Sequence, residues 1–288
     1  MGEVHVAPTR RLKNILGLAA ILALAGIALL PLIHITVTVI AQGASTIAKT
    51  GLLEFLTGTP HPMNPRNPGG IGPAIEGTLI ILALSLCITI PIALNTSIFI
   101  AEFKGTPISR TALLLSLLLV EFPTILVGLY IYSTVVEPMH RFSLLAGALA
   151  VSIVMLPYMV VEMSEALKSI PRELREAAYS LGASRFKTVY RILLGAAKRG
   201  ILAGVLLGAA KAVGETAPLL FTLYGAFNTY PHSILDPGAA VSLLIYEYAW
   251  QPTPGFRELA WGAALVLMAM VALLIAAARI LAGRRVIY

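Results

Sequence analysis

Six stretches of the chain are apolar for long enough to cross a lipid bilayer. A helix needs about 20 residues to span the hydrocarbon core. Windows near that length with few or no charges occur at 15–41, 78–101, 112–136, 144–161, 201–224 and 259–278. Inside lipid a helix satisfies its own backbone polar groups. The sequence therefore predicts an all-α, polytopic membrane protein with about six transmembrane helices.

The composition excludes several other classes of protein. Of the 288 residues, 58% are hydrophobic and 12% are charged, whereas soluble domains are about a quarter charged. The net charge is +7, but the basic residues lie in short clusters without interleaved aromatic residues, so we expect no nucleic-acid partner. Cys87 is the single cysteine, and neither a metal-binding motif nor a catalytic arrangement is found. We expect a non-catalytic protein that binds lipid and no metal.

The distribution of Lys and Arg predicts the orientation. Loops rich in these residues remain in the cytoplasm, and with six spans most of them share a face with both termini. Only Lys49, Arg66, Arg141 and Arg257 fall on the other face. We therefore expect a multi-pass protein of the cytoplasmic membrane with both termini cytoplasmic. Its parts would be an N-terminal segment (1–14), a transmembrane domain (15–282) containing a cytoplasmic loop (165–199), and a C-terminal tail (283–288).

The cytoplasmic loop contains the pattern of a short amphipathic helix. Pro171 suits a first helical turn and Gly182 suits the left-handed residue that ends a helix. Between them, one apolar stripe follows helical spacing and consists of Leu174, Ala177, Ala178 and Leu181. Such a helix could dock into a groove of a partner protein or lie on the lipid headgroups. The pattern alone favours neither.

The fifth apolar stretch carries two opposite charges. Lys211 and Glu215 stand four residues apart, which places them on one helix face. They could form a structural ion pair that lets the span insert, or they could line an anion pathway. The same stretch has small residues at four-residue spacing, which permit close helix packing: Gly200, Gly204, Gly208 and Ala212.

Prolines predict bends in four of the spans. Proline removes one internal helical hydrogen bond, and the spans contain Pro91, Pro123, Pro157 and Pro218. We expect Pro218 to loosen the fifth span one turn after the charged pair. Glu121, beside Pro123, is a further intramembrane charge.

Part of the cytoplasmic loop resembles a known motif. Glu176-Ala-Ala-Tyr-Ser-Leu-Gly182 is similar to the EAA motif of ABC importer permeases. In that family, the resemblance implies a coupling helix seated in a cleft of the cytosolic ATPase. It assigns this coupling role to Leu174, Glu176, Ala177, Ala178, Leu181 and Gly182.

The run from Ala209 to Thr222 is more specific. It reads Ala-Ala-Lys-Ala-Val-Gly-Glu-Thr-Ala-Pro-Leu-Leu-Phe-Thr and resembles the signature of phosphate importer permeases of the PstA type. The resemblance implies a type I (MetI-like) permease fold and places Lys211, Glu215 and Thr216 in the substrate pathway. The family commonly has Arg at the position of Lys211 and often at that of Val161. Lys keeps the positive charge but lacks the planar guanidinium group, which can donate two hydrogen bonds to one phosphate.

The resemblance also implies a set of partners. These are a homologous second permease, a cytosolic ATPase dimer and an extracytoplasmic phosphate-binding protein. The chain lacks a phosphate-binding loop for ATP, so we expect ATP and magnesium on the ATPase and no cofactor on this chain. The expected function is phosphate import. The alternatives are a permease for molybdate, tungstate or sulfate, or a self-sufficient secondary transporter.

Overall fold

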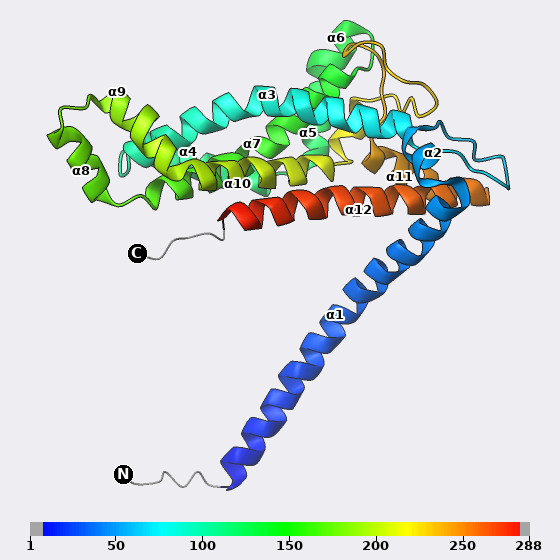
Figure 1. Ribbon diagram of the computed structural model, residues 1–288, viewed down its shortest axis with the longest axis horizontal. Helices are drawn as coiled ribbons and strands as arrows, with labels where there is room; N and C mark the ends of the chain where they lie inside the picture. The colour runs from blue at the N-terminus through cyan, green and yellow to red at the C-terminus, as the bar shows by residue number, and fades with distance from the viewer. Residues whose placement is uncertain (1–7, 283–288) are drawn as a thin grey trace.

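The computed structural model describes residues 8–282, which form a bundle of helices with one helix extending away from it (Figure 1). Within these residues the backbone is helical or irregular, and β pairing is limited to an isolated bridge between Pro60 and Gly69. This confirms the all-α prediction. The predicted tail at 283–288 and residues 1–7 of the N-terminal segment lie outside the described residues.

The helices follow one another with mostly short connections. In chain order they are α1 (Pro8–Thr50), α2 (Leu52–Thr57), α3 (Gly72–Glu102), α4 (Pro107–Val120), α5 (Thr124–Ile131), the π-helix η1 (Tyr132–Val136), α6 (Glu137–Met139), α7 (Leu144–Lys168), α8 (Arg172–Ser180), α9 (Arg185–Lys187), the π-helix η2 (Thr188–Leu193), α10 (Leu194–Val213), the 3-10 helix η3 (Pro218–Phe221), α11 (Val241–Ala249) and α12 (Pro254–Ala282). In the described chain, five helices are long and apolar enough to cross a membrane, or six if one bent pair counts as a span.

The bend predicted at Pro123 is present, and it divides the predicted span at 112–136 into two helices. α4 ends at Val120, and the helical segment Thr124–Met139 continues at 97° to it. The break falls before Pro123, which lacks an N–H and disfavours helical geometry at the residue before it. Pro91 and Pro157, by contrast, lie inside continuous helices, because a membrane helix can tolerate one missing hydrogen bond.

The fifth span also differs from the prediction at its end. α10 ends at Val213, Gly214 is its C-cap, and the Glu215 N–H donates to the Ala212 carbonyl in a turn. Pro218 therefore does not loosen a helix, and instead begins η3. Proline suits a first helical position, because the N–H that it lacks would have no partner there.

α7 is the centre of the bundle and packs against α3, α4, α5 and α10. Two thirds of its apolar window (67%) is buried. It runs parallel to α3, and small hydroxyl groups join the two helices: Ser85 Oγ donates to the Ala148 carbonyl at 2.9 Å, and Ser97 Oγ donates to the Val160 carbonyl at 3.1 Å. Such hydrogen bonds hold helices together where lipid offers no hydrophobic driving force.

α10 approaches α7 through its small residues. A Cβ atom added at Gly200 would lie 2.5 Å from the Ala166 Cβ, and one at Gly208 would lie 2.7 Å from the Met159 Cγ. Real atoms do not approach so closely, so these positions require glycine for this packing. The predicted small-residue stripe is therefore confirmed as a helix contact.

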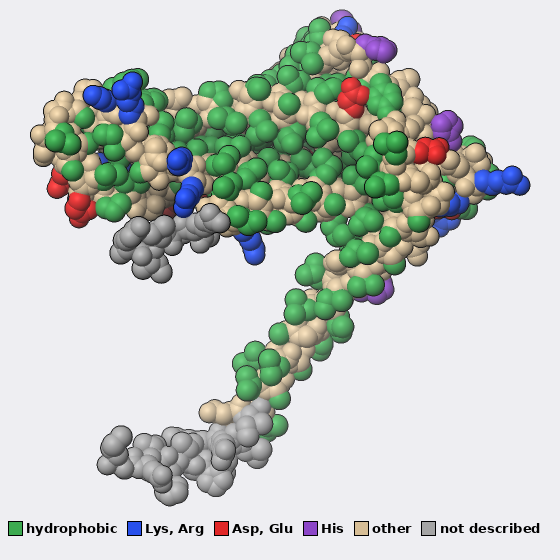
Figure 2. Space-filling model, viewed as in Figure 1, with side chains coloured by type: hydrophobic (Ala, Val, Ile, Leu, Met, Phe, Trp, Pro, Cys, Tyr) green, Lys and Arg blue, Asp and Glu red, His purple; other side chains and the backbone are tan. Residues whose placement is uncertain are grey.

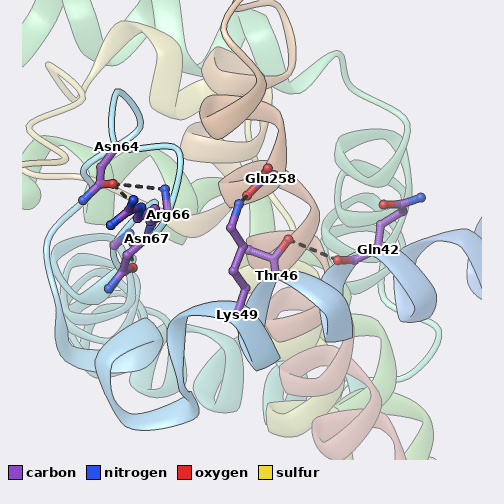
Figure 3. A network of polar contacts seen from close by, with 8 residues as sticks. Gln42, Thr46, Lys49, Asn64, Arg66, Asn67 and Glu258 are labelled. Atoms are coloured by element: carbon purple, nitrogen blue, oxygen red, sulfur yellow. Dashed lines mark hydrogen bonds and ion pairs between the residues drawn. The ribbon is translucent and has the colours of Figure 1, made fainter.

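α1 leaves the bundle, and the apolar window of its described part is wholly exposed (0% buried). Near its C-terminal end it crosses α12, where Lys49 Nζ lies 2.7 Å from the Glu258 Oε2 (Figure 3). The segment between α2 and α3 lies beside this contact. There the Asn64 side chain accepts hydrogen bonds from the N–H groups of Arg66 and Asn67.

Charged side chains gather at the ends of the bundle. In Figure 2, Lys and Arg lie over α9 and acidic side chains lie over α8, while the middle of the visible face is mainly apolar. The opposite end carries the segments that follow α1, α2 and η3 (Figure 1). Such a distribution suits a bundle whose middle lies in lipid and whose two ends face water.

Candidate functional site

α8 has the helix ends predicted from the sequence. Pro171 is its N-cap residue, and Gly182 adopts a φ of +77° just after its C-cap. The Ala183 N–H donates to the Ala178 carbonyl at 3.1 Å, and the Gly182 N–H donates to the Tyr179 carbonyl at 2.9 Å. This is the pattern of a helix closed by a left-handed residue. The prediction that Gly182 is the left-handed residue that ends the helix is therefore confirmed.

The apolar stripe of α8 divides into a buried part and an exposed part. Ala178 is 4% exposed, and α8 packs against η2. Leu181 is 89% exposed, Leu174 is 37% exposed, and Ala177 is exposed as well. Glu176 also lies on the surface. The helix thus presents apolar side chains outward at one end of the bundle.

A second turn fastens the loop to the bundle. The Ser184 Oγ accepts from the Lys187 N–H at 3.3 Å and caps α9, the usual role of serine at a helix N-terminus. The chain then continues through η2 into α10, and Val189 and Leu193 pack with Ile98 of α3 and Leu167 of α7. The loop therefore rests on the ends of three helices.

The charged pair lies at the other end of α10. Lys211 Nζ lies 2.5 Å from the Glu215 Oε1, with side chains 38% and 7% exposed. Glu215 follows the end of α10 and does not lie on the helix as predicted. Ser242 of α11 holds this turn, because its Oγ donates to the Glu215 carbonyl at 2.6 Å. Since α10 has 20 residues, about 30 Å separates the pair from the loop at 1.5 Å per residue.

Several elements meet around this pair. Lys211 Nζ lies 5.7 Å from the centre of the Tyr158 ring on α7, and the Tyr158 Oη donates to the Val120 carbonyl at the α4–α5 break at 3.4 Å. Gly128 of α5 lies so close to Pro218 of η3 that a Cβ atom there would be 2.7 Å from the proline Cα. The pair therefore lies at the end of α10, and Tyr158 links it to the end of α4.

Thr216 is the third predicted pathway residue. It is half-buried, and its carbonyl accepts hydrogen bonds from the N–H groups of Leu219 and Leu220. It thus begins the turn that leads into η3, next to Glu215. The structure brings the three predicted pathway residues into one region and places the predicted coupling residues in another.

Sequence reasoning missed several neighbours of these sites. Glu102, at the end of α3, accepts hydrogen bonds from Arg175 of α8, and Tyr158 and Ser242 contact the charged pair. The only available signal for Glu102 was an acidic residue at the end of an apolar stretch. Its partner is 73 residues away in the sequence, so no local pattern could reveal it.

Comparison with protein families decides the class of the chain. Residues 93–286 match the family described as the binding-protein-dependent transport system inner membrane component. The chain belongs to this family. The matched region contains both α8 and the charged pair. This inner membrane component is therefore a multi-pass, non-catalytic subunit of a transport system.

Relatives along nearly the whole chain carry more specific names. The "Probable phosphate transport system permease protein PstA" of Methanocaldococcus jannaschii is 40% identical over 268 residues, which cover 93% of each chain. The phosphate transport system permease protein PstA of Xylella fastidiosa is 37% identical over 251 residues, covering 85% of this chain and 83% of the relative. PstA 1 of Mycobacterium tuberculosis is 35% identical over 287 residues, covering 96% of this chain and 91% of its own.

Solved structures share the fold of this inner membrane component. A chain of the MetNI methionine ABC transporter in an inward-facing conformation has a TM-score of 0.57 at 20% identity, covering 73% of this chain and 95% of that chain. A bacterial ABC transporter that imports alginate has a TM-score of 0.57 at 16% identity, covering 94% and 97%. These similarities confirm the predicted fold of an ABC transporter permease.

Proposed function

We propose that the chain is the permease subunit through which an ATP-driven importer moves inorganic phosphate across the cytoplasmic membrane. Phosphate is assigned as the substrate because the chain is 40% identical, over 93% of both chains, to a relative named as a probable phosphate permease. A self-sufficient secondary transporter is not favoured, because the family works with a binding protein.

α8 is the coupling helix of this proposal. Its exposed Leu174, Ala177 and Leu181 form a small apolar surface on a helix that lies outside the apolar windows. A short helix with alanine at its centre allows close approach to a groove on a partner. The partner is a cytosolic ATPase dimer, which carries ATP and magnesium. Both termini lie on the same cytoplasmic side, as the distribution of Lys and Arg supports.

The remaining partners are a second, homologous permease and an extracytoplasmic phosphate-binding protein. The exposed apolar window of α1 supports the second permease, because a helix that leaves its own bundle can pack against another subunit as well as against lipid. The binding protein follows from the family, whose members work with one.

Lys211 supplies positive charge to the anion pathway. Its ammonium group has three donors, one of which reaches Glu215, and its side chain is more exposed than that carboxylate. Glu215 holds the lysine in place, and Thr216 lies beside it at the start of the next turn. The pair lies where α10 ends and where the α4–α5 bend contacts α7, a place suited to movement during transport.

Uptake by the reconstituted complex tests the substrate. The complex would be placed in vesicles with its ATPase and binding protein, and radiolabelled phosphate uptake would be measured with ATP inside. Excess unlabelled phosphate, sulfate, molybdate and tungstate would be added in turn as competitors. We expect ATP-dependent phosphate uptake that only unlabelled phosphate suppresses. Stronger suppression by another oxyanion would assign the permease to that anion, and uptake without the ATPase would contradict the proposal.

A further inference from the structure

The C-terminal end of α3 contacts the loop of residues 165–199, which we call the coupling loop, at three separate places. Glu102 meets Arg175 of α8, Phe103 meets Arg185 of α9, and Asn95 meets Tyr190 of η2. None of these contacts follows from chain connectivity, since the loop joins α7 to α10 and not to α3. We call the six residues together the α3 clasp.

The pair of Arg175 and Glu102 is the most enclosed of the three contacts. Arg175 Nε and Nη2 each donate to the Glu102 Oε1 at 3.2 Å, and the two side chains are 19% and 9% exposed. The same guanidinium donates to the carbonyl of Ile170 at 3.2 Å and to that of Leu167 at 3.4 Å. Arg175 therefore joins α8 to the ends of both α3 and α7. Lysine could not reproduce this, because it lacks the planar fork of donors.

The other two contacts extend the attachment along the loop. The Arg185 guanidinium lies 4.4 Å from the centre of the Phe103 ring, a cation–π contact. The Tyr190 Oη donates to the Asn95 Oδ1 at 3.0 Å. α8, α9 and η2 are thus each fastened to the last two turns of α3.

α3 is well suited to carry a displacement into the membrane. It is continuous for 31 residues from Gly72 to Glu102, and hydroxyl hydrogen bonds from Ser85 and Ser97 tie it to α7 along its length. Energetic coupling between distant sites travels through such rigid, packed elements. A movement of α8 that pulls Glu102 would shift α3 and α7 together.

We propose that the α3 clasp is a set of positioning residues that transmits movement of the coupling loop into α3. This inference rests on the proposed coupling role of α8. Without the clasp, the loop would hold α3 only through the apolar packing of Val189 and Leu193 with Ile98, and ATP hydrolysis would drive less transport.

Exchange of the charged partners tests the clasp in the reconstituted complex. The variants are Arg175→Glu, Glu102→Arg and the double variant, and the readouts are co-purification with the ATPase and the ATP hydrolysed per phosphate imported. Each single variant should raise that ratio by roughly fivefold, the lower end of the coupling seen between distant sites. The double variant restores the ion pair but not the hydrogen bonds of Arg175 to the Ile170 and Leu167 carbonyls, so it should bring the ratio part of the way back.

A variant at an exposed clasp residue tests the clasp without changing a buried side chain. Arg185 is exposed, so Arg185→Gln should leave folding intact and still raise the ratio. The matched control is Glu258→Gln, which breaks the interhelical pair with Lys49 at the other end of the bundle and should leave the ratio unchanged. Each variant replaces one charged side chain with glutamine and removes one contact between helical segments, at opposite ends of the bundle.

The outcomes separate the clasp from the proposed function. Single variants with an unchanged ratio would overturn the clasp, as would a double variant that restores assembly but leaves the raised ratio. Absence of ATP-driven uptake in the unmodified complex would overturn the proposed function itself. A raised ratio in the single variants and in Arg185→Gln, partly reversed in the double variant, supports the clasp.

Discussion

The two candidate sites depart from the usual distribution of side chains in opposite ways. α8 exposes apolar residues, with Leu181 at 89%, while the end of α10 buries a charged residue, with Glu215 at 6%. α8 lies outside the apolar windows, and Lys211 lies within one. An exposed leucine outside lipid gains from a protein partner, whereas a buried carboxylate gains from a cation.

The contrast predicts how each site responds to substitution. The exposed face of α8 has few internal contacts to lose, so substitutions there should change binding and leave the fold intact. The charged pair is part of the fold, so its substitutions should change stability as well.

Lys211→Met should have the largest effect, because it leaves the Glu215 carboxylate without its cation. Breaking a buried pair costs about 3 kcal/mol at the lower end of the measured range, and that end applies because Lys211 is 38% exposed. We expect loss of phosphate uptake and a lower unfolding temperature of the purified complex. Uptake and unfolding temperature both equal to those of the unmodified complex would contradict the assignment.

The double variant Lys211→Met with Glu215→Gln separates transport from folding. It removes both charges, so the stability lost in the single variant should largely return. If Lys211 attracts the anion, uptake stays low. Recovery of uptake together with stability would make the pair a purely structural one.

Gly182→Leu should have the next largest effect, because Gly182 has a φ of +77°. A side chain costs about 1–2 kcal/mol in this left-handed conformation, and the end of α8 should change shape. We expect ATP hydrolysis to continue while phosphate uptake falls, measured together in reconstituted vesicles. Normal coupling in this variant would show that the end of α8 does not transmit movement.

Leu181→Glu should change binding without changing the fold. Surface substitutions of this kind alter stability by less than about 0.5 kcal/mol, and a carboxylate would disfavour an apolar groove. Co-purification of the ATPase should fall sharply, with an unchanged unfolding temperature. The control is Ser180→Glu, which places the same charge on the neighbouring exposed residue, away from the stripe. Equal loss of ATPase co-purification in both variants would mean that the added negative charge weakens binding, and not the loss of the apolar side chain of Leu181.

Ser184→Ala should have the smallest effect on transport. It removes the side-chain oxygen that accepts from the Lys187 N–H, and loss of such a cap costs about 1 kcal/mol. Amide hydrogen exchange should quicken at Phe186 and Lys187, with phosphate uptake unchanged. A large loss of uptake would mean that α9 itself contacts the partner.

The sequence predicted features that depend on local chemistry. Hydrophobic windows gave the long helices, because solubility in lipid depends on composition alone. The ends of α8 followed from Pro171 and Gly182, because proline and glycine restrict or release the backbone at single positions. The small-residue stripe on α10 followed from helical spacing.

Features that depend on the path of the chain were not predictable in this way. The residues after Gly214 are apolar enough to continue a span, yet the chain turns there. Proline predicted a bend at Pro123 but not its angle of 97°, and it did not show that Pro91 and Pro157 would lie inside continuous helices. The contact of Arg175 with Glu102 joins residues far apart in sequence, and only the packed bundle brings them together.

Crosslinking from Leu181 is the sharpest test of whether α8 binds the ATPase. A Leu181→Cys variant in a Cys87→Ser background carries a single thiol, because Cys87 is the only cysteine of the chain. In the intact complex with its ATPase, binding protein and second permease, we predict a crosslink from this thiol to the ATPase whose yield changes when ATP is added. Labelling of this thiol by a membrane-impermeant reagent from outside the cell, or crosslinking to lipid alone, would contradict it.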